Sequence, residues 1–500
     1  MGRHQQHNFE PGRVHYKGVE VDERSFQSIR TRRSFFTECG GGIGAIALWN
    51  LLQSEGKAAE SIPSVNPLQR KTPHFLPRAK NVIFLFMEGA PSQIDLFDPK
   101  PELQKWEGQS LPESMRQNLR FAFIKPTAKV WASPRKFQRC GQSGMEFSDY
   151  VPHLAGCADD ICMVRSMFSE QFNHHPGQLL MHCGSPLVGR PSMGSWTMYG
   201  LGSESQDLPG FVVLNSGARG GSSSSGIFSS GFLPSMYQGV PLSNTGEPIA
   251  YLKNPPGIDS AEQRARLDTI RALNEKRYAQ TGDIEIASRI ASYELAFRMQ
   301  AAAPELLDLS KEGAETLKMY GADQEPTRQF GTNCLLARRM VERGVRFVLL
   351  SHATWDDHSG LIGGHKKNCQ ITDQPCAALI KDLKQRGLLK DTLIVWGGEF
   401  GRTPLAQTLM PGKESALGRD HHPDAFSMWL AGGGIKPGET VGRTDDLGMN
   451  VVEDKVHVHD LHATLLHCLG LNHEKLTYRH QGRNFRLTDV AGKVVQKLLA

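Results

Sequence analysis

The sequence lacks features that several classes of protein require. It has no Lys/Arg block interleaved with aromatic residues, and its net charge of +5 is small for 500 residues. We therefore expect no nucleic-acid partner, because such partners need clustered basic residues. None of the nine cysteines forms a CxxC pair, which excludes a zinc ribbon. With 39% hydrophobic and 22% charged residues, the composition is that of a globular chain.

Apolar runs of membrane-spanning length are also lacking. The segment "RTRRSFFTECGGGIGAIALWNLL" places Arg32 and Arg33 before an apolar, Gly-rich run at 40–52. That run is shorter than the roughly 20 residues needed to cross a bilayer. The pattern predicts a twin-arginine export signal over 1–60, with a buried helix carrying a basic N-terminus as the alternative. We expect the twin-arginine export machinery to bind this chain and the mature protein to be periplasmic or extracellular. We also expect the mature chain to have no integral membrane segment.

The rest of the chain has the pattern of one α/β domain. A Pro-rich linker is predicted at 61–80, and the domain follows at 81–490. Apolar runs typical of strands buried on both faces recur in it: "NVIFLFM", "ICMVRSM", "FVVL", "VRFVLLS", "TLIVWGG" and "FSMWLAGGG". Helical segments lie between several of these runs. They predict a three-layer sandwich with a mostly parallel central sheet and helices on both faces.

Two segments depart from this alternation. The Gly/Ser-rich stretch at 217–231 predicts a surface loop or lid. The stretch at 260–320 is rich in Ala, Glu, Arg and Leu, with charges at helical spacing, and predicts a helical insertion of two or three helices. A coiled-coil partner site is the alternative there, but the heptad is not sustained, which favours an amphipathic bundle.

Polar clusters follow or precede the predicted strands, at the sheet edge where α/β proteins bind ligands. Each cluster alone is better explained by helix capping or by backbone hydrogen bonds. Together they supply the mixture of Asp, Glu and His that binds a divalent metal such as zinc, manganese, calcium or magnesium. Two ions are one arrangement, the first near Glu88 and Glu399 and the second near Asp356, His358 and His421. The candidate metal ligands are Glu88, Asp356, Asp357, His358, Glu399, His421 and His422.

Several motifs resemble the alkaline phosphatase and sulfatase superfamily from residue 81 onward. "NVIFLFMEGA" resembles its first strand, with Glu88 at the usual Asp, and "TLIVWGGEFG" resembles the strand that ends in Ser-Asp-His-Gly. "HHPGQLLMHCG" resembles the sulfatase signature, and "VHDLHATLLHCLGL" resembles the C-terminal helix. At finer grain, "FMEGAPSQIDLFDPKP", "WDDH", "GGEFGRTP" and "GRDHHPDAF" are similar to a domain-of-unknown-function family of twin-arginine-exported, sulfatase-like bacterial proteins. The resemblance implies an alkaline-phosphatase-like fold and transfers no activity.

The departures from the superfamily pattern concern the nucleophile. His174 stands where the sulfatase signature has its Cys nucleophile. Ser92 or a metal-activated water would have to attack instead, and His174 is a candidate base or nucleophile. Arg402 or Arg419 would hold the ester anion, because a guanidinium matches its oxygens.

Three functions remain open on the sequence. The first is a metal-dependent hydrolase of sulfate or phosphate esters, with a sulfated or phosphorylated glycan as partner. The second is a non-catalytic protein that binds a glycan or a partner protein on a degenerate sulfatase-like fold. The third is a phosphomutase or transferase on the same metal platform.

Overall fold

The computed structural model describes residues 66–116, 121–217, 225–242, 253–407 and 416–500. The predicted export signal at 1–60 lies outside the described residues, as do 61–65 of the predicted linker and 218–224 of the predicted Gly/Ser-rich loop. Among the helices that the structure describes, none has the length and apolar character needed to cross a bilayer.

A nine-stranded sheet forms the centre of the described residues. Its order is β12-β4-β11-β8-β1-β7-β5-β6, and β15 pairs with β4. Only β11 among these strands runs antiparallel to its neighbours. The predicted α/β class with a mostly parallel sheet is confirmed. The strands are β1 (Asn81–Met87), β4 (Ile161–Phe168), β5 (Phe211–Ser216), β6 (Val240–Leu242), β7 (Phe347–His352), β8 (Thr392–Gly397), β11 (Phe426–Ala431), β12 (Glu439–Val441) and β15 (Val456–His457).

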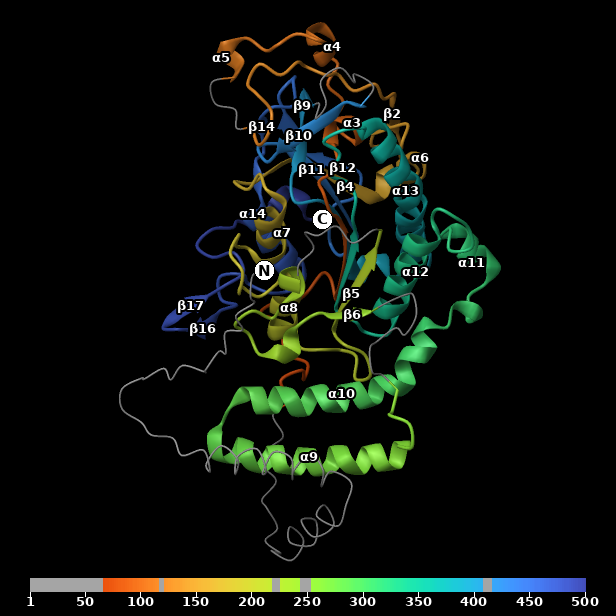
Figure 1. Cartoon of the computed structure of the whole chain (residues 1–500), viewed down its shortest axis with the longest axis vertical. Helices are drawn as coiled ribbons and strands as arrows, with labels where there is room; N and C mark the ends of the chain where they lie inside the picture. Colours follow the sequence, from red (N-terminus) through yellow and green to blue (C-terminus); the bar gives the residue numbers. More distant parts are fainter. Residues whose placement is uncertain (1–65, 117–120, 218–224, 243–252, 408–415) are drawn as a thin grey trace, which may run out of the picture. The chain divides into compact units, whose positions relative to one another are not determined.

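Helices cover both faces of this sheet, and β1 shows why. Successive side chains of a strand point to opposite faces, so Val82, Phe84 and Phe86 enter one apolar core and Ile83, Leu85 and Met87 enter another. The first core is closed by α7 (His174–Cys183), α8 (Met193–Leu201) and α14 (Val458–Cys468). The second is closed by α12 (Arg328–Glu342) and α13 (Leu361–Gln385). Figure 1 shows the two groups of helices on either side of the strands.

Other elements lie outside this sandwich. The helices α9 (Ser260–Thr281) and α10 (Ile284–Leu307) form an antiparallel pair, and both begin with an Asp N-cap, Asp259 and Asp283. Short helices are α3 (Gln93–Leu96), α4 (Leu103–Trp106), α5 (Glu113–Arg116), α6 (Pro152–Ala155) and α11 (Ala314–Met319). The described residues also form four two-stranded hairpins: β2 (Phe137–Cys140) with β3 (Met145–Ser148), β9 (Gly401–Gln407) with β10 (Gly418–His422), β13 (Arg443–Thr444) with β14 (Val451–Glu453), and β16 (Tyr478–His480) with β17 (Arg483–Phe485).

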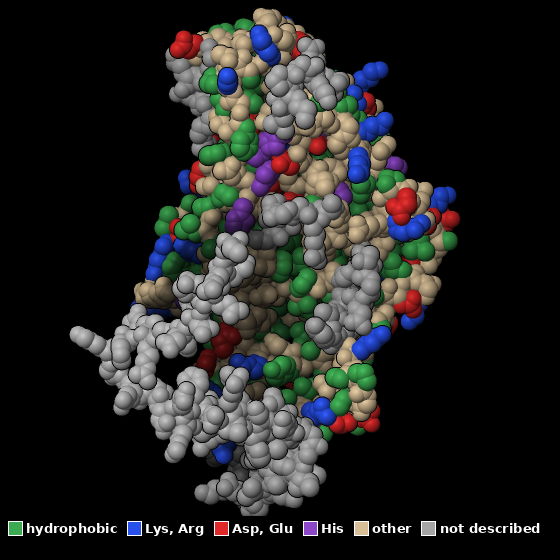
Figure 2. Space-filling model, in the orientation of Figure 1, with side chains coloured by type: hydrophobic (Ala, Val, Ile, Leu, Met, Phe, Trp, Pro, Cys, Tyr) green, Lys and Arg blue, Asp and Glu red, His purple; other side chains and the backbone are tan. Residues whose placement is uncertain are grey.

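The reversed direction of β11 decides what gathers at one edge of the sheet. Because β11 is antiparallel, its first residue Phe426 lies beside Met167 near the end of β4. The hairpin β9–β10, which connects β8 to β11, therefore lies at the edge where the parallel strands end. Chain segments that follow β1, β4, β7 and β8 meet this hairpin there. On the face drawn in Figure 2, histidine and acidic side chains reach the surface beside hydrophobic ones.

Candidate metal centre

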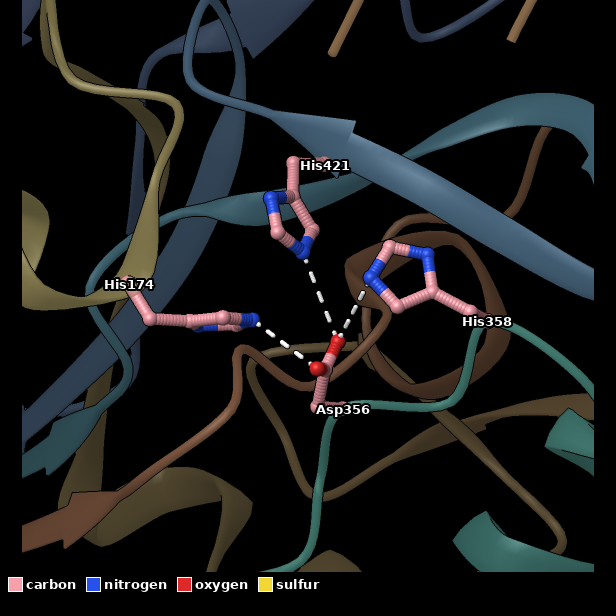
Figure 3. A group of neighbouring side chains, drawn as sticks. All are labelled: His174, Asp356, His358 and His421. Atoms are coloured by element: carbon pink, nitrogen blue, oxygen red, sulfur yellow. Dashed lines mark hydrogen bonds and ion pairs between the residues drawn. The ribbon is translucent and has the colours of Figure 1, made fainter. Parts of the chain in front are cut away.

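Four side chains from three distant parts of the chain converge at this edge. Each of His174, Asp356, His358 and His421 offers one ligand atom, and these atoms lie within 4.8 Å of one another. His174 begins α7 after β4, Asp356 and His358 lie in the loop after β7, and His421 lies in β10. Figure 3 shows the three imidazoles pointing at the Asp356 carboxylate from different sides.

The Nε2 atoms of the three histidines face the carboxylate of Asp356. His174 Nε2 is 3.1 Å from Asp356 Oδ2, and His358 Nε2 and His421 Nε2 are 3.0 Å and 3.4 Å from Oδ1. His174 Nε2 is buried and makes no hydrogen bond of good geometry. The Asp356 side chain keeps 41% of its surface exposed, so a ligand can reach the group from solvent.

The other ring nitrogen of each histidine is held by an oxygen. His421 Nδ1 donates to the carbonyl of Phe172 at 2.6 Å, and His358 Nδ1 donates to Gln407 Oε1 at 2.7 Å. His174 Nδ1 donates to Glu399 Oε1 at 2.6 Å. A carbonyl or carboxylate oxygen only accepts, so each ring carries a proton on Nδ1, and Nε2 is the nitrogen that faces Asp356. This outer set of oxygens is typical of histidines that bind metals.

The facing nitrogen of His421 is an acceptor when its ring is neutral. A neutral His421 and the carboxylate of Asp356 would place two lone pairs 3.4 Å apart, which is favourable only if a positive charge lies between them. Burial lowers the pKa of His421 to about 4. Burial also opposes protonation of His174, but the adjacent carboxylates of Asp356 and Glu399 outweigh it and raise the pKa to about 9. Burial likewise works against the Asp356 carboxylate, yet its three histidine partners and Arg402 hold its pKa well below the usual range. The donor set therefore fits a cation.

Arg402 fixes Asp356 in place. Its guanidinium is fully buried and donates to Asp356 Oδ1 at 2.6 Å. The same guanidinium also donates to three backbone carbonyls, those of Gly89, Ala90 and Arg419. Because its N–H groups donate to these oxygens, Arg402 orients the carboxylate and has no free pair of N–H groups to bind an anionic ligand.

Two glycines allow the loop after β7 to approach its neighbours. A Cβ on Gly89, which has φ of +105°, would lie 2.5 Å from the backbone nitrogen of Asp356. A Cβ on Gly418 would lie 2.1 Å from the carbonyl carbon of His358. The same loop is hydrogen-bonded to β10, where the N–H of Arg419 donates to the carbonyl of Asp357 at 3.2 Å. Side chains at these two positions would push Asp356 and His358 out of place.

The other predicted acidic ligands surround the group. Glu399 is buried, accepts from His174 Nδ1 and also accepts from the backbone N–H of Gly89. Glu88 is buried at the end of β1, and its backbone bonds to His352 and Trp355. Asp357 Oδ2 accepts from His365 Nδ1 at 2.7 Å. None of the three belongs to the group of four ligand atoms found in the described residues.

The remaining predicted site residues lie away from the group. His422 follows His421 in β10, so its side chain points to the other face of that strand, where it is buried. Ser92 is fully buried and its hydroxyl donates to Asp95 Oδ2 at 2.6 Å. Arg419 is fully buried and its Nε donates to Asp95 Oδ2 at 2.8 Å. The structure thus brings His174 and Arg402 to the candidate centre and leaves Ser92 and Arg419 outside it.

Three residues of the site were not among the predicted metal ligands or catalytic residues. Gln407 at the end of β9 and the carbonyl of Phe172 orient two of the histidines. Asp420, fully buried beside His421, accepts from the backbone of another loop. A glutamine or a carbonyl becomes informative only once the β9–β10 pairing is known. Asp420 lies in the polar stretch "GRDHHPD". Because side chains alternate between the two faces of a strand, its side chain points away from those of its neighbours.

Replacing Gln407 with leucine is expected to weaken the affinity of the candidate centre for a divalent metal by roughly 10–100-fold, the range typical of lost outer partners. The change keeps the side chain's size but removes the oxygen that fixes the His358 ring. Competition with a chromogenic chelator measures it. Gln374→Leu is the matched control, because Gln374 of α13 donates to the backbone carbonyl of Lys318 in α11 and takes no part in the group. Equal affinities in the two variants would contradict the orienting role.

The fold and the site define a three-layer α/β protein with a candidate His/Asp metal centre. Residues 79–499 match the family described as "Protein of unknown function (DUF1501)", and the chain belongs to that family. The predicted membership of a domain-of-unknown-function family is confirmed. A comparison with curated proteins found no significant sequence match.

Solved structures of low identity are also similar to the chain. They include the TAB5 alkaline phosphatase mutant His 135 Glu with Mg bound in the M3 site (10% identity, 81% of this chain and 100% of that chain, TM-score 0.32). A second is the lipoteichoic acid synthase LtaP from Listeria monocytogenes (8% identity, 85% and 79%, TM-score 0.35). A third is the PsFucS1 sulfatase from Pseudoalteromonas sp. (11% identity, 82% and 71%, TM-score 0.32). At such identities, the chemistry of this chain has to come from its own residues.

Proposed function

We propose that this chain is an exported, metal-dependent hydrolase of sulfate or phosphate esters that works without a covalent nucleophile. One observation carries the proposal: three imidazole Nε2 atoms and one carboxylate, each held by a second partner, converge at a solvent-accessible point. This arrangement is costly without a cation at His421, because the buried Nε2 of its neutral ring otherwise faces the Asp356 carboxylate at 3.4 Å.

Zinc is the ion that this donor set favours. Calcium and magnesium prefer oxygen ligands, whereas imidazole suits zinc and its transition-metal neighbours. His174, His358, His421 and Asp356 would supply four ligands. The exposed face of Asp356 leaves room for a water or a substrate oxygen. An ion of this kind, when bound, lowers the pKa of a bound water and polarises an ester oxygen.

The chain's own residues then hold the reacting groups. Arg402 and the outer oxygens of Glu399, Gln407 and Phe172 keep the ligand atoms aimed at one point. Ser92 is not proposed as the nucleophile, because its hydroxyl is buried against Asp95. The absence of an available hydroxyl nucleophile among these positions favours direct attack by water.

Turnover of 4-nitrophenyl sulfate and 4-nitrophenyl phosphate by zinc-loaded protein tests the proposal. We expect hydrolysis that is lost on chelation, restored by zinc, and absent from His358→Ala and His421→Ala. The matched control is His480→Ala, which removes a histidine on the β16–β17 hairpin and should keep the activity. Stoichiometric zinc without turnover of either ester would support the non-catalytic binding protein instead.

Export is part of the proposal and rests on Arg32 and Arg33 with the apolar run that follows. Cell fractionation of the full chain should place it outside the cytoplasm. The double change Arg32→Lys, Arg33→Lys should retain it inside, and an unchanged distribution would contradict this part.

A further inference from the structure

An exposed phenylalanine lies at the mouth of the candidate metal centre. The Phe123 ring packs edge-to-face against both His358 and His421, with ring centroids 5.3 Å apart in each case. Its side chain nevertheless keeps 61% of its surface exposed. A second phenylalanine, Phe172, is 41% exposed, and its own backbone carbonyl accepts from His421 Nδ1. Single exposed apolar residues are ordinary on protein surfaces, but two exposed phenylalanines beside one polar site indicate a surface that contacts a ligand.

The loop that carries Phe123 is anchored by a buried carboxylate. The backbone N–H groups of Ala122, Phe123 and Ile124 all donate to Asp420 Oδ2, at 3.0, 2.9 and 3.2 Å. Asp420 Oδ1 accepts from the backbone N–H of His421 at 2.9 Å. One buried side chain therefore ties the loop to the strand that carries a candidate ligand. Three successive N–H groups on one oxygen fix the loop's backbone, and with it the position of Phe123.

We propose that Phe123 is a specificity-determining residue that stacks on a sugar ring carrying the ester, and that Asp420 is its positioning residue. The inference rests on the proposed function, since the ester group would sit at the His/Asp centre. An aromatic face offers dispersion contact to an apolar surface. A pyranose has one apolar C–H face and polar edges that remain in water. A platform as exposed as Phe123 suits such a ring better than a fully apolar group, which gains most from enclosure on several sides.

Paired ligands that share the anion and differ in the ring test the proposal. Glucose 6-sulfate and ethyl sulfate both present a sulfate ester, and isothermal titration of the zinc-loaded full chain gives their affinities. We expect glucose 6-sulfate to bind the wild type more tightly than ethyl sulfate by about 10-fold, equivalent to one stacking contact. Phe123→Ala should remove that advantage and leave the affinity for ethyl sulfate within about twofold. Phe123→Trp should restore it.

The positioning role of Asp420 has its own readout. Asp420→Asn should reduce the preference for glucose 6-sulfate as Phe123→Ala does, and the double variant should lose no more than either single change. If Asp420→Asn fails to fold, the Phe123 variants still decide the proposal.

Four outcomes would overturn the inference. Two concern Phe123→Ala: an equal loss of affinity for both probes, or no loss of affinity for either. The other two concern the zinc-loaded wild type: no binding of either probe, or tighter binding of phenyl sulfate, whose ring is fully apolar, than of glucose 6-sulfate. A failure of the proposed function is distinguishable, because it appears as absent zinc or absent ester turnover in the wild type. Zinc content should be unchanged in Phe123→Ala, which alters no candidate ligand.

Discussion

Replacing Asp356 with alanine is expected to lower zinc affinity by more than about 100-fold, beyond the range for outer partners. Asp356 supplies the one carboxylate in the group of four, and all three histidine Nε2 atoms face it. Its removal leaves three neutral donors beside the buried cation of Arg402, which repels a second positive charge. Metal analysis of purified protein and competition with a chelator measure the loss.

Asp357→Asn is the matched control for this change. Asp357 is the next residue and also a carboxylate, but its oxygen accepts from His365 Nδ1 and takes no part in the group. We expect its zinc content to equal that of the wild type. Stoichiometric zinc in Asp356→Ala, or loss of zinc in Asp357→Asn alone, would contradict the assignment of ligands.

The second large effect concerns stability. Asp95→Asn is expected to lower the free energy of unfolding by about 3–5 kcal/mol, because it leaves a buried cation without its partner. Asp95 and Arg419 are both fully buried, and Arg419 Nε lies 2.8 Å from Asp95 Oδ2. Urea denaturation followed by circular dichroism measures the change. Asp149→Asn removes the half-exposed partner of Arg135 at 3.7 Å and should cost less than about 1 kcal/mol. Equal losses in the two variants would contradict this account.

The contribution of Asp95 should also depend on pH. Burial would raise the pKa of its carboxyl, but the charge of Arg419 and hydrogen bonds from Arg419, Ser133 and Ser92 outweigh it and lower the pKa. A carboxyl with a lowered pKa stabilises the fold above its unfolded pKa of about 3.9 and loses that effect as pH falls toward the folded value. The stability difference between wild type and Asp95→Asn should therefore be constant above about pH 5 and shrink below about pH 4. A difference that grows on acidification would contradict the direction of the shift.

The sequence predicted the strands well because buried parallel strands are continuous apolar runs. "NVIFLFM" is β1 in full, and the runs beginning at Ile161, Phe211 and Thr392 are β4, β5 and β8. The run predicted at 426–434 ends earlier, since β11 stops at Ala431 and three glycines with positive φ follow. The apolar pattern could not predict that β11 runs antiparallel, because a buried strand has the same pattern in either direction.

The site was predictable in outline and not in detail. His174, Asp356, His358 and His421 were all candidates because polar residues at the ends of parallel strands meet at one edge. Which of two neighbours faces the centre depends on strand phase and loop geometry, and this distinguishes His421 from His422. The roles of Arg402 and Arg419 could not be separated, since both follow from which buried oxygens lie near them. Gln407 acts through a hairpin pairing that the sequence pattern does not reveal.

Zinc K-edge X-ray absorption on the wild-type chain, loaded with one equivalent of zinc, would show directly which atoms bind the ion. We expect a shell of nitrogen and oxygen atoms at about 2.0–2.2 Å with the multiple-scattering signature of three imidazoles. That signature should weaken in His421→Ala. A sulfur shell at about 2.3 Å, or zinc bound by oxygen atoms without imidazole, would contradict the His/Asp centre.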